Sequence, residues 1–374
     1  MPPHPRTIVL AANSCWYITN FRLGLARALR EAGYSTVALA PSDPANETRL
    51  RGLGIEFSAL SIDRSGLNPL AELRLLLRMR RLLKRLAPVA YLGFTVKPNI
   101  YGALAASTLG IPVIANVSGL GTAFIRKGLL QRMVTFLYRL AFRSRTTVFF
   151  ENPDDRRLFL ERQIVRADQT RLLPGTGIDL DRFAPKALPA GNLTFLMVAR
   201  LLGDKGVREF VEAARNLRPH LPEARFQLLG GVDEGNRTAI PQAELQGWIE
   251  EGVIEYLGET DDVRPFIAEA TAVVLPSYRE GLPRSLLEGA AMGRPLIATD
   301  VPGCRELVDD GVNGFLCAAG DSSSLALAMK RFARLSDEER AVMGTTSRRE
   351  AEERFSEAFV VEAYLDALAC LRPK

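Results

Sequence analysis

The chain has 374 residues and a mass of 41.1 kDa, more than one hydrophobic core usually organises, so we expect two domains. With 47% hydrophobic and 24% charged residues, the composition excludes a disordered or fibrous protein. The net charge of +5 is unevenly distributed. Residues 1–186 carry 27 Lys and Arg against 13 Asp and Glu (+14), whereas residues 187–374 carry 21 against 30 (−9). The basic half is therefore expected to meet an anionic partner.

Short apolar runs alternate with amphipathic segments along the first half. Strands are expected at residues 7–12, 35–40, 54–60, 89–94, 111–117 and 146–151. Helices are expected at residues 18–32, 44–52, 69–86, 99–109, 122–142 and 153–163. This alternation predicts an α/β fold with a parallel, doubly wound sheet covered by helices on both faces.

The same alternation restarts after residues 183–192, a stretch that contains Pro and Gly and has no apolar period. Six further strands are expected at residues 193–199, 225–231, 253–258, 271–276, 294–300 and 314–319. We therefore expect Rossmann-like domains at residues 1–186 and 187–355, followed by a helix at 356–371. The carboxyl ends of the strands of both domains would face one ligand-binding cleft.

Several kinds of site are disfavoured by the sequence. The two histidines, His4 and His220, and the four dispersed cysteines form no pattern of transition-metal ligands or disulfides. The cysteine usage favours a reducing cytoplasm. The first strand leads into Asn13 and Ser14 without a glycine, so a dinucleotide fingerprint is absent. No metal or cofactor is expected, and chemistry would depend on carboxylates, cations and backbone dipoles.

Two cations follow the first strand of the second half. Arg200 comes directly after that strand, and Lys205 precedes Gly206 at the start of a helix. Cations beside a helix amino terminus suit a diphosphate, although an ordinary loop with solvated charges is the alternative.

A second motif, EGLPRSLLE, occupies residues 280–288. Gly281 allows a close backbone approach, and the N–H groups near Leu282 and Pro283 can face phosphate oxygens. Glu280 and Glu288 can each accept two hydrogen bonds from the hydroxyls of a ribose or a hexose. Both would otherwise be ordinary surface carboxylates.

These motifs, with GRPLIATDVPGCRELVDDGVNGFL at residues 293–316 and Asp321, resemble the retaining glycosyltransferases of family 4. That resemblance covers nearly the whole chain and implies the GT-B fold, in which the last helix returns to the first domain. It implies that Arg200 and Lys205 bind the donor diphosphate, that Glu288 holds the ribose and that Glu280 contacts the donor sugar.

Three segments of the first half resemble a narrower branch, which extends undecaprenyl diphosphate-linked sugars with UDP-sugars: residues 61–69, 95–112 and 117–124. Family 4 members often have a Gly-rich loop after the first strand and a His on the acceptor side, and this sequence has neither. Asn13, Ser14, Lys97 and Asn99 are the candidate acceptor contacts, and a helix start is the alternative role of Lys97 and Asn99.

Two basic segments explain the charge of the first half. On a helical wheel of residues 70–86, one arc is apolar and the opposite arc carries Arg74, Arg78, Arg81 and Arg85, with Leu70, Leu73 and Leu77 beside them. Residues 124–145 carry further cations among Phe, Leu and Met. Apolar residues among arginines suit an anionic membrane surface, whereas a solvated helix face is the alternative. No nucleic-acid-binding motif accompanies the charge.

The sequence thus predicts a retaining transferase at the cytoplasmic membrane face, which moves an N-acetylhexosamine from a UDP-sugar to a polyprenyl diphosphate-linked saccharide. Another acceptor, a UDP-sugar epimerase of the same fold and a nucleotide-sugar-binding scaffold are the alternatives.

Overall fold

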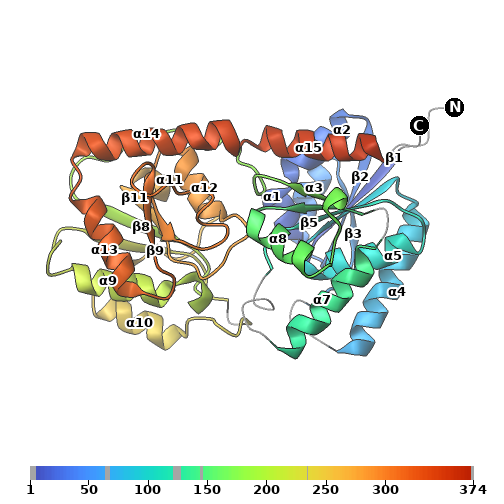
Figure 1. The fold of residues 1–374 in the computed structure, drawn as a ribbon, viewed down its shortest axis with the longest axis horizontal. Helices are drawn as coiled ribbons and strands as arrows, with labels where there is room; N and C mark the ends of the chain where they lie inside the picture. Colours follow the sequence, from blue (N-terminus) through green and yellow to red (C-terminus); the bar gives the residue numbers. More distant parts are fainter. Residues whose placement is uncertain (1–5, 64–67, 121–127, 144–145, 234, 372–374) are drawn as a thin grey trace. The chain divides into compact units, whose positions relative to one another are not determined.

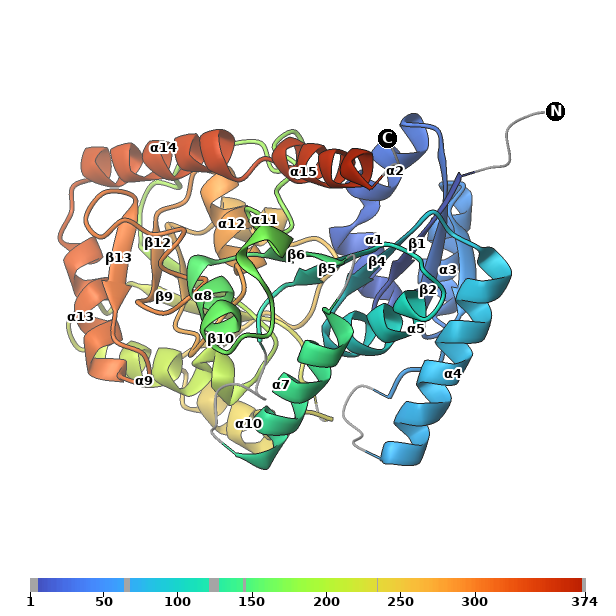
Figure 2. The ribbon, with the colours of Figure 1, turned by 45° about the vertical axis from the view of Figure 1, so that its right-hand side comes forward.

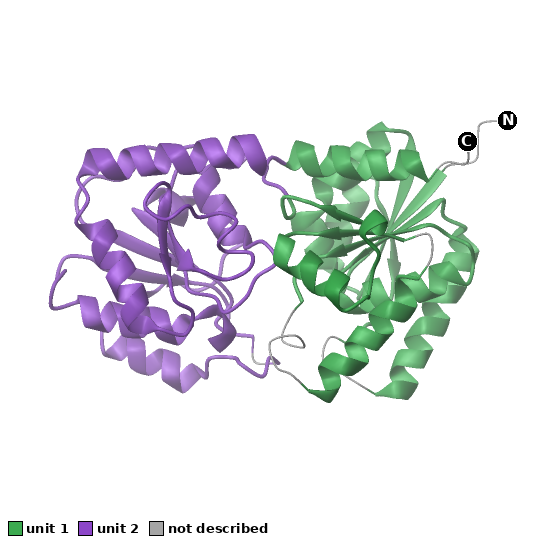
Figure 3. Ribbon diagram, viewed as in Figure 1, with its two compact units in different colours: residues 1–176, 357–374 green, residues 177–356 purple. Residues whose placement is uncertain are grey.

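The structure is a computed structural model that describes residues 6–63, 68–120, 128–143, 146–233 and 235–371 (Figure 1). The chain forms two compact units (Figure 3). The first unit comprises residues 1–176 and 357–374, and the second comprises residues 177–356. Each unit contains one sheet whose strands are all parallel.

The sheet of the first unit has seven strands in the order β3-β2-β1-β4-β5-β6-β7. Its strands are β1 Arg6–Ala11, β2 Tyr34–Ala40, β3 Glu56–Ala59, β4 Ala90–Phe94, β5 Val113–Val117, β6 Thr146–Phe150 and β7 Thr170–Leu172. Its helices are α1 Cys15–Phe21, α2 Leu23–Glu31, α3 Pro44–Gly52, α4 Pro69–Leu86, η1 Pro98–Gly102, α5 Ala103–Ser107, α7 Leu129–Ala141, α8 Pro153–Glu161, η2 Ala167–Gln169 and α15 Glu357–Cys370.

Helices cover both faces of this sheet (Figures 1 and 2). Buried side chains of α4, α5, α7 and α8 pack against one face. Those of α1, α2, α3 and α15 pack against the other face, so the last helix completes the core of the first unit. Asp43, Asn68 and Asn152 cap α3, α4 and α8, each of which begins with Pro, a residue that suits the first helical turn.

The first unit differs from the prediction in several elements. The helix expected at residues 18–32 is broken at Arg22, whose backbone leaves the helical region. Strand β7 was not predicted, because a three-residue edge strand has too few residues to show a period. The predicted segments 61–69, 117–124, 122–142 and 124–145 lie partly outside the described residues, which leave out 64–67, 121–127 and 144–145.

The sheet of the second unit has six strands in the order β10-β9-β8-β11-β12-β13. Its strands are β8 Thr194–Val198, β9 Arg225–Leu229, β10 Glu255–Tyr256, β11 Ala272–Leu275, β12 Leu296–Thr299 and β13 Gly314–Cys317. Its helices are η3 Gly203–Lys205, α9 Val207–Leu217, α10 Gln242–Glu250, α11 Arg264–Ala268, α12 Arg284–Ala291, α13 Ser322–Ala333 and α14 Asp337–Arg354.

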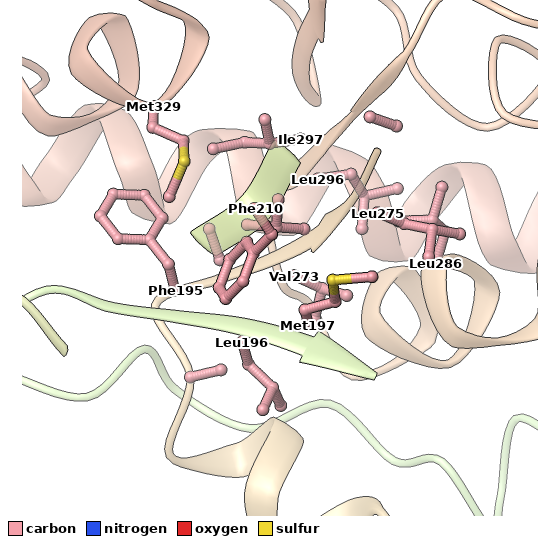
Figure 4. Close-up of a cluster of buried hydrophobic side chains, with 14 of the residues drawn as sticks. Phe195, Leu196, Met197, Phe210, Val273, Leu275, Leu286, Leu296, Ile297 and Met329 are labelled. Carbon is pink, nitrogen blue, oxygen red and sulfur yellow. The ribbon is translucent and has the colours of Figure 1, made fainter. Parts of the chain in front are cut away.

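One apolar cluster fixes this second sheet between its helices (Figure 4). Phe195 of β8 stacks on Phe226 of β9, with ring centroids 5.5 Å apart, and meets Phe332 of α13 edge to face. Leu286 of α12 and Phe210 of α9 are both fully buried in the same cluster. The loops that follow β8 and β11 therefore begin from a rigid, well-packed base.

The units divide ten residues before the boundary expected at Lys186. Residues 177–186 belong to the second unit, in which two arginines bind carbonyl groups of this segment. Arg348 donates to the carbonyl of Phe183 at 2.8 Å, and Arg294, which has no exposed surface, donates to the carbonyls of Lys186 and Ala187. The absence of an apolar period at residues 183–192 correctly indicates a loop, but this loop packs on the second unit and does not link the two units.

None of the helices within the described ranges combines the length and the apolarity needed to cross a bilayer.

Candidate functional site

The strand order of the second sheet reverses beside β8. From β8 the chain proceeds outward to β9 and β10, and it then returns to add β11, β12 and β13 on the other side. The loops that leave the carboxyl ends of β8 and β11 therefore diverge around one crevice, where open α/β sheets usually bind ligands. Both sequence motifs lie on these two loops, because Arg200 and Lys205 follow β8 and residues 280–283 follow β11.

The two motifs are joined by an ion pair. The Lys205 ammonium lies 2.5 Å from a carboxylate oxygen of Glu280, and both side chains are largely buried. The structure thus brings together residues that are 75 positions apart in the sequence. Arg200 extends further into solvent and pairs with Asp233, which follows β9, at 2.7 Å. An exposed cation whose partner is also partly exposed is available to exchange that partner for a phosphate group.

Gly206 sets the distance between the two loops. Its backbone is left-handed (φ +75°), and a Cβ at this position would overlap the carbonyl oxygen of Pro276, directly after β11. The N–H of Tyr278 donates to the carbonyl of Asp204 at 3.0 Å, which ties the loops together beside the ion pair. Glycine is therefore required here for a close backbone approach.

The remaining residues of the second motif lead into α12. Gly281 and Pro283 are buried and Leu282 is half-buried. This segment therefore packs closely along the carboxyl edge of the sheet. Pro283 precedes the helix without a side-chain cap. The amino terminus of a helix carries partial positive charge and orphan N–H groups, which suit an anion.

Glu288 lies one turn into α12 and is paired with Arg284. The Arg284 Nε atom is 2.9 Å from Glu288 Oε1, and the carboxylate is largely buried. Burial raises the pKa of Glu288 above its ordinary value, while the Arg284 guanidinium lowers it. The carboxylate can thus accept a hydrogen bond from Arg284 and keep acceptor capacity for a hydroxyl group.

The first unit has the same kind of strand reversal, between β1 and β4. Asn13 and Ser14 follow β1, and Lys97 and Asn99 follow β4. The Asn13 N–H donates to the hydroxyl of Thr95 at 3.2 Å, which joins the two loops. Thr95 has a left-handed backbone (φ +67°), a conformation that is rare for a β-branched residue and is often found at functional sites.

The four candidate residues of the first unit have different environments. Ser14 caps α1 by accepting a hydrogen bond from the N–H of Tyr17, and Lys97 pairs with Glu72 of α4. Asn99 is 1% exposed, and its amide donates to the carbonyl of Asn116 at 2.7 Å. Asn99 therefore supports this edge of the sheet from inside, whereas Asn13 and Ser14 are partly exposed.

A buried charged cluster beneath the same edge was not predicted. Arg22 has no exposed surface, donates to the hydroxyl of Tyr17 at 2.9 Å and lies 3.6 Å from Glu151. Its guanidinium also lies over the ring of Phe94, 4.4 Å from the centroid. Arg22 falls within the predicted helix and Glu151 ends a predicted strand, so no period distinguished them. The one available signal was that a carboxylate, Glu151, occupies the last position of a predicted buried strand.

Burial and the partners of Glu151 act on its pKa in opposite directions. Burial raises the pKa, whereas Arg22 and the amide of Asn116, 3.2 Å away, lower it, and the net result is a pKa raised to about 7. Within the described residues, no group of three or more His, Cys, Asp or Glu side chains is arranged to hold a metal ion.

Comparison with known families covers both units. Residues 18–176 match the family described as "Glycosyl transferase 4-like domain", and residues 192–334 match "Glycosyl transferases group 1". A Campylobacter jejuni protein, N,N'-diacetylbacillosaminyl-diphospho-undecaprenol alpha-1,3-N-acetylgalactosaminyltransferase, is 30% identical over 327 residues, which cover 83% of this chain and 84% of the relative. The chain belongs to the group 1 glycosyl transferases. It is therefore a transferase enzyme, as the resemblance implied.

Further relatives of this group 1 glycosyl transferase have similar names. The Escherichia coli UDP-Gal:alpha-D-GlcNAc-diphosphoundecaprenol alpha-1,3-galactosyltransferase is 25% identical over 63% of this chain and 64% of its own length. Among solved structures, Anabaena Alr3699/HepE in complex with UDP and glucose has a TM-score of 0.80 at 20% identity, covering 98% of this chain and all of that one. With two Rossmann-like units, these similarities confirm the predicted GT-B fold class.

We expect the stability of this group 1 glycosyl transferase to fall as the pH rises from about 4.5 to about 7. In this range the unfolded chain releases the Glu151 proton that the folded state retains, because the pKa is raised from 4.5 to about 7. The Glu151→Gln variant should lack this contribution, which is on the order of 1 kcal/mol per pH unit. Urea denaturation at pH 5 and pH 7.5 measures the difference.

The exposed Glu161, at the end of α8, provides the control. Glu161→Gln should retain the pH dependence of the unmodified protein. If Glu151→Gln also retains it, the raised pKa of Glu151 is wrong.

Proposed function

We propose that this enzyme is a retaining glycosyltransferase that moves an N-acetylhexosamine from a UDP-sugar to a polyprenyl diphosphate-linked saccharide. The observation that carries the donor half of the proposal is the Lys205–Glu280 pair at the strand reversal of the second sheet. The acceptor half is supported by the names of the Campylobacter jejuni and Escherichia coli relatives, both of which specify a diphospho-undecaprenol sugar.

In this proposal the second unit binds the donor. Arg200 and Lys205 compensate the diphosphate charge, and the N–H groups of Gly281 and Leu282 face its oxygens from the start of α12. Glu288 accepts hydrogen bonds from the ribose hydroxyls, while Glu280 contacts the sugar ring. The cations act most strongly as the bond to the diphosphate breaks, because negative charge then accumulates on the leaving oxygen.

The reaction needs no histidine base. The bond between the sugar C1 and the diphosphate oxygen breaks, and the acceptor hydroxyl oxygen bonds to C1 from the same face. The hydroxyl proton passes to the departing phosphate oxygen, so the products are UDP and the lengthened lipid-linked saccharide. Lys205 and Arg200 supply the charge compensation that a divalent cation provides in other transferases, so we expect activity without an added metal.

The first unit would receive the acceptor at its own strand reversal. Asn13 and Ser14 are partly exposed at this edge, and Lys97, which pairs with Glu72, lies on the loop after β4. Asn99 is assigned a supporting role instead of a contact, because its side chain is buried. A cation and several uncharged polar groups suit the phosphates and hydroxyls of a lipid-linked saccharide.

Helix α4 supports attachment to the cytoplasmic face of an anionic membrane. Leu75, Met79 and Leu83 are buried against the sheet, which leaves Leu70, Leu73 and Leu77 exposed. The exposed arginines of α4 that follow the same face are Arg74, Arg78, Arg81 and Arg85. Over the described part of the chain these four have no ion-pair partner, whereas Arg208, Arg215, Arg225 and Arg331 of the second unit are paired with carboxylates.

Helix α7 has a comparable apolar stripe. Leu129, Met133 and Phe136, at helical spacing, are all exposed, and Leu129 is 83% accessible. Apolar side chains beside unpaired arginines can enter the headgroup region while the cations remain near the phosphates. Both helices pack on η1 and α5 on one face of the first sheet (Figures 1 and 2).

We expect Lys205→Gln to lower the rate of acceptor-dependent UDP release by about 100-fold or more, the usual effect of removing one group that stabilises the leaving charge. The substitution keeps a flexible polar side chain, one atom shorter, and removes its charge. Lys330→Gln, on α13 of the same unit, is the control and should leave the rate unchanged. An unchanged rate in Lys205→Gln would show that the diphosphate binds elsewhere.

We expect the full chain to sediment with vesicles that contain anionic phospholipid at low salt, and to release them at high salt. Each cation near the surface contributes about 1 kcal/mol, so Arg74, Arg78 and Arg81 together contribute ~3 kcal/mol, or more than 100-fold in affinity. The triple Arg→Gln variant should therefore bind far more weakly.

The matched control removes the same charge from the second unit, by Arg208→Gln, Arg215→Gln and Arg225→Gln. This control should bind the vesicles as the unmodified protein does. Equal loss in both triple variants would indicate a response to net charge alone, and no loss in the α4 variant would refute the assignment of α4.

A further inference from the structure

The chain passes between the two units twice, after Thr176 and after Ser356. On the side of the second unit these two passages lie next to each other. The N–H of Ile178 donates to the carbonyl of Phe355 at 2.8 Å, and Ile178 also pairs with Ser356 as an isolated parallel bridge. Any movement of one passage within the second unit therefore involves the other.

The first passage is flanked by two glycines with left-handed backbones. Gly175 has φ +64° and Gly177 has φ +71°, with Thr176 between them. Residues that absorb a change of backbone angles are typical of hinges, and glycine accepts such angles without a steric cost. Because the backbone at these glycines is not restricted by a side chain, the position of the Gly177 carbonyl depends on its hydrogen-bond partners.

One of those contacts comes from the donor motif itself. Arg284 Nη1 donates to the carbonyl oxygen of Gly177 at 2.6 Å, while Arg284 Nε contacts Glu288 at 2.9 Å. The same guanidinium lies 5.8 Å from the ring centroid of Phe183, in the segment that follows Gly177. A planar guanidinium presents its donors in a fixed fork, so one end cannot shift independently of the other.

Two other arginines hold the same segment without contacting the donor carboxylates. Arg348 donates to the carbonyls of Phe183 and Ala291, and Arg294 donates to those of Lys186 and Ala187. These residues explain why the segment stays with the second unit. They are also suitable comparisons for Arg284, because they bind carbonyl groups of the same segment but do not contact Glu288.

We propose that Arg284 is a positioning residue that couples nucleotide binding at Glu288 to the chain passage at Gly177. The inference rests on the proposed function, in which Glu288 accepts hydrogen bonds from the ribose. A ribose bound there orders the Glu288 carboxylate, which orders the Arg284 guanidinium and, through it, the Gly177 carbonyl. Because such coupling is reciprocal, a loosened passage also weakens nucleotide binding.

Hydrogen–deuterium exchange of the full chain, with and without UDP, tests this coupling. In the unmodified protein, UDP should slow exchange both in α12 and at residues 175–179. In Arg284→Gln, UDP should still slow exchange in α12, but its effect at residues 175–179 should fall by about five-fold or more, the lower end of typical coupling. The Kd for UDP should rise by a similar factor.

Arg348→Gln is the matched control, because it removes a carbonyl-binding arginine from the same segment. Its exchange at residues 180–183 should be faster in the absence of UDP, and the UDP effect at 175–179 should persist. Equal UDP effects at 175–179 in Arg284→Gln and the unmodified protein would overturn the proposal, as would the absence of any UDP effect there in the unmodified protein.

Glu288→Gln separates this inference from the function on which it rests. If Glu288→Gln leaves the Kd for UDP unchanged, the ribose assignment fails, and the coupling fails with it. If Glu288→Gln weakens UDP binding while Arg284→Gln retains the full UDP effect at 175–179, the donor assignment stands and the coupling alone is refuted.

Discussion

In each sheet, the reversal of strand order determines where polar side chains can meet. Parallel strands all end at one edge, and the loops that leave two neighbouring strands diverge where the direction of winding changes. In the second unit this places Lys205, after β8, beside Glu280, after β11. In the first unit it places Asn13, after β1, on the hydroxyl of Thr95, after β4. Neither pair is close in the sequence, so the chemistry that we propose for these residues depends on this constraint.

The two units differ in charge, as they differ in the ligands that we propose for them. Unpaired arginines are found on α4 of the first unit, which in our proposal meets a lipid surface and a diphosphate-linked acceptor. Exposed arginines of the second unit are mostly neutralised by neighbouring carboxylates. In the proposal, the cations that bind the donor are those at the strand reversal, where a leaving diphosphate would concentrate negative charge.

Much of the fold could be predicted because buried parallel strands are short apolar runs and their covering helices are amphipathic. Helix α4 was predicted with its observed bounds, since Asn68 caps it and Pro69 begins it. Arg22 could not be predicted, because nothing in a single sequence shows that an arginine within an amphipathic segment will be buried against Glu151 and Phe94. The units divide at Thr176 and not at Lys186. Arg294 and Arg348 bind carbonyl groups of residues whose sequence resembles a free linker.

The donor motifs were recognisable, but their connections were not. The sequence placed Arg200 and Lys205 after one strand and Glu280 after another, with Glu288 on the helix that follows. It did not indicate that Lys205 pairs with Glu280 or that Arg284 pairs with Glu288, because these contacts depend on the twist of the sheet and on the start of α12. The environments of the candidate acceptor residues were harder to predict, because Asn is usually a surface residue whereas Asn99 is buried.

The most direct test of the account is a panel of UDP-sugars assayed for UDP release with and without a polyprenyl diphosphate-linked saccharide. The account predicts UDP release that depends on the acceptor, is greatest with a UDP-N-acetylhexosamine and yields a lengthened lipid-linked product. A free epimer of the sugar, or no reaction with any donor in the presence of lipid-linked acceptors, would contradict it.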